Sequence, residues 1–94
     1  AAQDMIQLGQ DKLREDYLLA TQKLTLKKAE IKLTEDTYDF VDKQYRNGLA
    51  GLTDVLDALN DIEKARFEYQ QALFDQRRAG LKAAELNGTL LSNL

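Results

Sequence analysis

The sequence contains no cysteine, no histidine, no tryptophan and no proline. Without cysteine there is no disulfide and no thiolate metal site. Without histidine, a Ser-His-Asp triad and the Glu-x-x-His motif of di-iron bundles are both excluded. No glycine-rich phosphate loop follows a predicted strand, and carboxylates on long helices mostly face solvent. We therefore predict that the chain is not an enzyme and that it holds no cofactor and no metal.

Long apolar runs are also missing, so this segment is not expected to cross a membrane as a helix, which takes about 20 apolar residues. The net charge is −3, and it is unevenly distributed. Residues 35–64 contain eight acids and three bases. Such an acidic segment disfavours nucleic acid and anionic lipid, and it favours cations or basic protein surfaces as partners.

Helix-forming residues fill both sides of a central pair of glycines, Gly48 and Gly51. No stretch alternates apolar and polar residues for long enough to indicate a strand. The sequence therefore predicts an all-α fold, a long antiparallel helical hairpin of the coiled-coil type. We expect helices at about 10–46 and 53–87, with the tip of the hairpin at about 47–52.

Local signals set these boundaries. Gly48 is placed to end the first helix, and Thr53 is the preferred cap of the second. The pair Asn87-Gly88 predicts the end of the second helix.

Apolar residues recur along both segments at steps of three and four residues, which is the coiled-coil period. The first seam consists of Leu13, Tyr17, Ala20, Leu24, Ile31, Tyr38, Val41 and Tyr45, with weak positions at Lys27 or Lys28 and at Thr34. The second consists of Val55, Ala58, Ile62, Ala65, Tyr69, Ala72, Gln76, Ala79, Ala83, Leu86 and Leu90. If the turn is centred between residues 49 and 50, facing positions have numbers that sum to about 99. Tyr17 would then face Ala83, so that a bulky residue of the first helix meets a small one of the second.

A further apolar stripe, Phe67, Phe74 and Leu81, lies on the second helix outside its seam. A two-helix hairpin buries only one stripe per helix. The extra stripe therefore favours neighbours on two sides, as in a larger bundle, an oligomer or a ring of helices. The alternative is a stripe that remains partly exposed.

Asp54 and Asp57 lie three residues apart, so they share one face of the second helix near its start. In an isolated hairpin they complement the positive end of the helix dipole. In a ring of hairpins, the repeated pair would line an opening and attract cations.

The motif Tyr45-Arg46-Asn47-Gly48 is followed by Thr53-Asp54-Val55-Leu56-Asp57-Ala58 and, after an alanine-rich helix, by Leu86-Asn87-Gly88-Thr89-Leu90. This pattern resembles the TolC-like outer membrane factor family, the exit ducts of tripartite efflux pumps and type I secretion systems. The resemblance covers residues 10–90 and points to the second of the family's two repeats. It implies a periplasmic α-hairpin, a fragment of a trimeric outer-membrane protein of a Gram-negative bacterium.

The resemblance also assigns roles to the tip. In that family the hairpin tips dock the periplasmic adaptor (membrane fusion) protein and form the entrance gate. The matching docking residues are Gly48, Leu49, Ala50, Gly51, Leu52, Thr53, Val55 and Leu56. Asp54 and Asp57 match acids that ring the entrance in some members. Ala50 departs from the pattern, because some members have at this position an arginine that helps to hold the entrance closed.

Two other hypotheses remain open. A free-standing antiparallel coiled coil that binds other helices has the same periodicity, and only the tip motif and the extra stripe count against it. A small helical enzyme or ligand carrier has no constellation of residues to support it.

Overall fold

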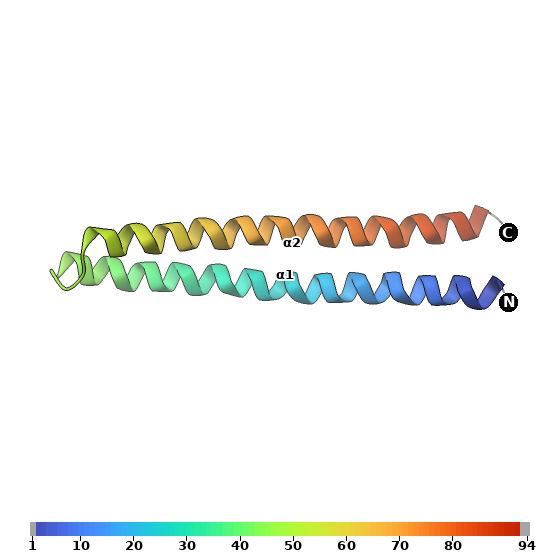
Figure 1. The fold of residues 1–94 in the computed structure, drawn as a ribbon, viewed down its shortest axis with the longest axis horizontal. Coiled ribbons are helices and arrows are strands. Elements are labelled where there is room, and N and C mark those ends of the chain that lie inside the picture. Colours follow the sequence, from blue (N-terminus) through green and yellow to red (C-terminus); the bar gives the residue numbers. More distant parts are fainter. Residues whose placement is uncertain (1, 93–94) are drawn as a thin grey trace. The chain divides into compact units, whose positions relative to one another are not determined.

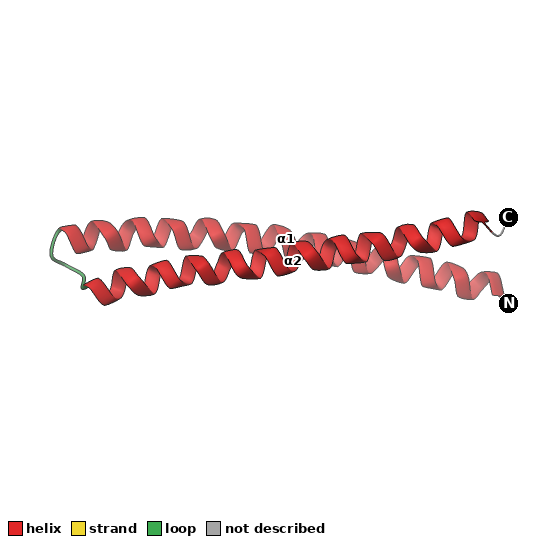
Figure 2. Ribbon diagram, turned by 90° about the horizontal axis from the view of Figure 1, so that it is seen from above, coloured by secondary structure: helices red, strands yellow, loops and turns green. Residues whose placement is uncertain are grey.

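The computed structural model describes residues 2–92, with side chains described for residues 9–85. Helix α1 comprises Ala2–Arg46 and helix α2 comprises Leu52–Ser92, and a short turn joins them. The two helices lie side by side and run in opposite directions (Figure 1), and the described residues contain no strand (Figure 2). The predicted all-α helical hairpin is confirmed.

The chain divides into two compact units. The turn-containing unit is Thr25–Gln71, and the terminal unit combines Ala1–Leu24 with Ala72–Leu94. Within each unit, a length of α1 packs against a length of α2.

Both helices are longer than predicted. Helix α1 already begins at Ala2 and passes through Gly9, and α2 continues beyond Asn87 and Gly88 to Ser92. The expected end of α2 at Asn87-Gly88 was therefore wrong. A glycine inside a helix costs only about 1 kcal/mol relative to alanine, and no proline follows to stop the helix.

The core is the predicted seam of α2. Its buried residues are Val55, Ala58, Ile62, Ala65 and Ala72. The facing seam of α1 is half-buried at Leu13, Ala20, Leu24, Lys27, Ile31, Thr34, Tyr38 and Val41. Tyr17 and Tyr45, which were also predicted to lie in this seam, are exposed. Alanine lets the α1 backbone approach closely, and the bulkier α1 side chains then cover the alanines while part of their own surface stays exposed. The predicted seam residues Leu86 and Leu90 lie outside the described side chains.

Polar contacts across the seam fix its register. In the turn-containing unit, Lys27 Nζ lies 3.2 Å from Glu68 Oε2 and 3.3 Å from Glu30 Oε2. In the terminal unit, Gln76 Nε2 donates a hydrogen bond of 3.0 Å to Thr21 Oγ1. These two cross-helix pairs have residue numbers that sum to 95 and 97, and the cross-helix ion pair of Arg66 with Glu35 gives 101, so the three values bracket the expected value of about 99.

The hydrogen bonds to Glu68 and Glu30 raise the pKa of Lys27 above its usual value. An upward shift means that the folded state favours the protonated lysine. The stabilising contribution of this pair is therefore complete at neutral pH and is lost only as the pH rises through the alkaline pKa of Lys27.

Candidate functional site

The turn ends α1 with a Schellman motif. The N–H of Leu49 donates to the carbonyl of Gln44 at 2.8 Å, and the N–H of Gly48 donates to the carbonyl of Tyr45 at 3.0 Å. These two bonds satisfy carbonyls that the end of a helix leaves unpaired. The motif requires a left-handed residue, and Gly48 supplies it with φ of 75°. The sequence signal at Gly48 was therefore read correctly.

Helix α2 begins with a different cap from the one predicted. The carbonyl of Gly51 accepts the N–H of Asp54 at 3.1 Å and that of Val55 at 3.4 Å, which makes Gly51 the N-cap. Asp54 Oδ2 in turn accepts the N–H of Gly51 at 2.9 Å. This is the return half of a capping box, in which the third helical residue reaches back to the cap. Thr53 lies inside the first turn of α2, so its expected role as the cap was wrong.

Leucines dominate the exposed surface of the tip. Leu49 is 75% exposed, Leu52 57% and Leu56 50%. Gly48, Gly51 and Thr53 are also exposed, and Ala50 is half-buried. Val55, the remaining docking residue expected from the sequence, lies buried in the seam and offers almost no surface to a partner.

Asp54 and Asp57 are both exposed, and they line one groove together with Asp61. Asp57 and Asp61 make no ion pair and no hydrogen bond within the described part of the chain. No group of three or more acidic residues among the described side chains is arranged to hold a metal ion. Asp54 thus has a structural task at the start of α2, whereas the other two carboxylates are free to meet a partner.

The structure also reveals an apolar stripe on α1 that the sequence analysis missed. Leu19, Leu26, Leu33 and Phe40 are spaced by seven residues, and each is more than half exposed. The equivalent stripe on α2 was predicted, and its members Phe67, Phe74 and Leu81 are 63%, 64% and 66% exposed. The seven-residue spacing of the leucines was the available signal, since a strict heptad repeat outside the seam marks a second contact face.

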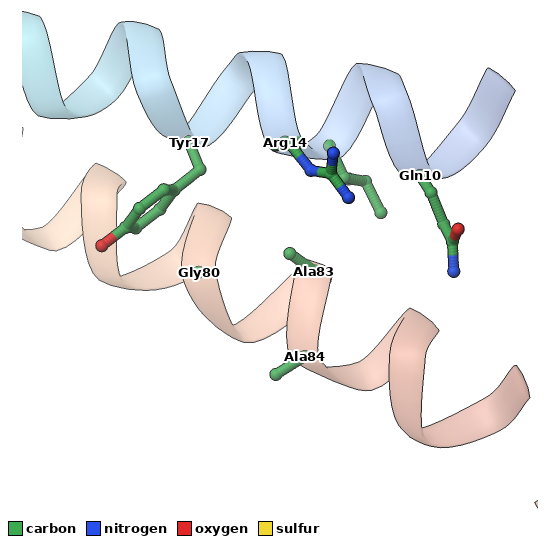
Figure 3. Close-up of a pocket in the computed structure, with 7 residues that line it drawn as sticks. Gln10, Arg14, Tyr17, Gly80, Ala83 and Ala84 are labelled. Atoms are coloured by element: carbon green, nitrogen blue, oxygen red, sulfur yellow. The ribbon is translucent and has the colours of Figure 1, made fainter. Parts of the chain in front are cut away.

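A separate groove in the terminal unit is lined by Leu13, Tyr17, Gly80 and Ala83, among others (Figure 3). The ring of Tyr17 reaches from α1 over Gly80. A Cβ atom at position 80 would lie 3.3 Å from Tyr17 Cε2, so glycine permits this close approach. Tyr17 and Ala83, which were predicted to face each other, line this common groove.

Comparison with family models, with curated proteins and with solved structures gives no significant match. Among the described residues, no helix combines the length and the apolar character needed to cross a membrane.

Replacing Gly48 with alanine tests the turn. We expect Gly48→Ala to lower the free energy of unfolding by about 1 kcal/mol, because an L residue is strained at this positive φ. The control is Gly9→Ala, which has open space around the added Cβ and is expected to be neutral or stabilising. Urea unfolding followed by circular dichroism measures both changes. Equal effects of the two substitutions would refute the left-handed turn at Gly48.

The capping assignment predicts that Asp54→Ala destabilises the hairpin by about 0.5–1 kcal/mol, because Gly51 loses the acceptor of its N–H. Thr53→Ala should change the free energy of unfolding by much less, since Thr53 is not the cap. The same urea titrations compare the two variants. A larger loss of unfolding free energy for Thr53→Ala than for Asp54→Ala would contradict the assignment of Gly51 as the cap and favour Thr53.

Proposed function

We propose that this chain is the periplasmic tip hairpin of a trimeric outer-membrane channel that serves a tripartite efflux or type I secretion system. In this proposal the tip docks the periplasmic adaptor protein and forms part of the entrance gate. Asp54 and Asp57 of each subunit ring the entrance. The proposal combines the tip motif of the sequence with one structural observation, the apolar surface that both helices expose outside their seam.

An isolated hairpin would leave these large apolar residues of both helices exposed to water. Each helix already uses one stripe against the other, and each still exposes a second stripe of large apolar residues. A row of large apolar residues at heptad spacing on an exposed helix face is typical of a contact face. In an α-barrel every helix has neighbours on both sides, which would cover both extra stripes. The exposed leucines at the tip would then provide an apolar contact for the adaptor.

A second candidate function is a free-standing antiparallel coiled-coil module. One observation favours it: the seam is already paired within a single chain, and polar contacts such as Lys27 with Glu68 fix its register. Such a module would bind other helices through the exposed stripes without being part of a channel.

The mass and the cell fraction of the native protein separate the two candidates. An antibody raised against these 94 residues would detect the protein in fractions of its host. The channel function predicts a membrane-bound species several times heavier than the 10.7 kDa of this chain. A soluble species of about 10.7 kDa would refute the channel and favour the coiled-coil module.

Docking at the tip can then be tested in the full-length protein. We expect Leu49→Ser to impair adaptor-dependent efflux of a fluorescent dye, because a 75% exposed leucine at the tip would lose its apolar contact. Leu49→Ile preserves the apolar surface and serves as the control. The antibody verifies that both variants reach the membrane in normal amounts. Unchanged efflux with Leu49→Ser would argue against docking at this residue.

A further inference from the structure

A groove runs beside the turn along one side of the turn-containing unit. Phe40 and Val41 of α1 form one wall, and the other wall is formed by Asp54, Asp57 and Asp61 of α2. Leu49 and Ala50 also line it. Phe40 is 62% exposed and Leu49 is 75% exposed, so these two apolar residues of the groove are open to solvent, whereas Val41 is half-buried.

The groove continues away from the turn. A second hollow, lined by Leu33 of α1 and by Lys64 and Ala65 of α2, shares Asp61 with the first. Leu33 and Phe40 lie seven residues apart on α1, so they provide two apolar contact points about 10 Å apart. This spacing matches the anchors that an amphipathic helix places into a groove, at i, i+3 or i+4, and i+7.

The charge along the groove is mostly negative. The carboxylate of Asp54 accepts a hydrogen bond from the N–H of Gly51, whereas Asp57 and Asp61 have no partner within the described part of the chain. The one basic residue of the two hollows, Lys64, forms no ion pair there either. Two unpaired carboxylates thus stand opposite an exposed aromatic ring.

We infer that this groove binds a basic amphipathic helix of a partner protein. The apolar face of that helix would cover Leu33 and Phe40, and its flanking lysines or arginines would pair with Asp57 and Asp61. Burying large apolar side chains would supply most of the affinity. The complementary charges would supply orientation and a faster association rate. This inference rests on the coiled-coil module, the second candidate function above, because in an α-barrel the neighbouring helices would cover Leu33 and Phe40 instead.

A second copy of the chain is a poorer occupant. Two copies that joined through this groove around a two-fold axis would bring the acidic walls of both copies into one small interface. The carboxylates of Asp57 and Asp61 would then face like charges, which opposes the contact. A basic helix avoids this repulsion and neutralises both residues.

The test uses the 94-residue chain and a synthetic helical peptide of about 20 residues, with leucines on one face and lysines beside them. Calorimetric titration measures the dissociation constant. We expect Asp57→Asn combined with Asp61→Asn to weaken binding about fivefold at low salt, because two ion pairs are lost. Phe40→Ala should weaken it by about tenfold through the loss of the aromatic contact.

Matched controls distinguish binding in the groove from attraction of the peptide by net charge or by exposed apolar side chains elsewhere on the chain. Asp11→Asn combined with Asp16→Asn removes the same charge from exposed positions outside the groove. Leu26→Ala removes a comparably exposed apolar side chain that lines neither hollow. Both controls should leave the dissociation constant unchanged, and a peptide with glutamate in place of lysine should not bind.

The outcomes decide the inference directly. Amide chemical shifts that move in the wild-type chain around residues 33, 40, 57 and 61 would support it. An equal loss of affinity in the groove variant and in the Asp11/Asp16 control would indicate attraction by net charge alone and overturn it. Failure of the lysine peptide to bind, or sedimentation showing that the groove instead joins two copies, would also overturn it.

Discussion

The structure depends on the close approach of two helices along a seam whose α2 side is rich in alanine. Ala58, Ala65 and Ala72 are among the most buried of the described side chains. Their small side chains let α1 come near enough for its larger residues to cover them, at alternating steps of three and four residues. Polar pairs such as Lys27 with Glu68 then favour one register of the two helices over the others.

The same arrangement leaves each helix with a second face that the hairpin does not cover. A seam occupies one stripe of a helix, yet Leu33 and Phe40 on α1 and Phe67 and Phe74 on α2 are each more than 60% exposed. Near the turn, this apolar surface adjoins unpaired carboxylates. The hairpin therefore combines a paired interior seam with outer surfaces suited to protein partners, and both proposals about its function come from those outer surfaces.

Much of the fold could be predicted because it depends on local and periodic signals. The heptad seams, the left-handed glycine at position 48 and the approximate register all follow from residue type and spacing. The cap of α2 could not be predicted, since Thr53 and Gly51 are both acceptable caps. The choice depends on which backbone N–H the carboxylate of Asp54 accepts, and in the structure it is that of Gly51. The ends near Gly9 and Gly88 were misjudged because an interior glycine costs little in a long helix.

The candidate site was less predictable. The exposed leucines and the two aspartates were identified from the tip motif, whereas the groove between Phe40 and Asp61 depends on the spatial relation of residues on different helices. The stripe on α1 is present in the sequence as a heptad repeat. It was not recognised because many other leucines and alanines lie along the same helix.

The most direct test of this account is the thermal melt of the isolated chain, followed by circular dichroism over a wide range of concentration. The seam of α2 buries only five of the described side chains, three of them alanines, so we expect the isolated hairpin to be only weakly stable while its outer stripes lack neighbours. We expect a helical chain with a broad, low-temperature transition that shifts upward with concentration as the α2 stripes of Phe67, Phe74 and Leu81 associate. A sharp transition at high temperature that is independent of concentration would contradict the account, because the seam would then suffice without any neighbour.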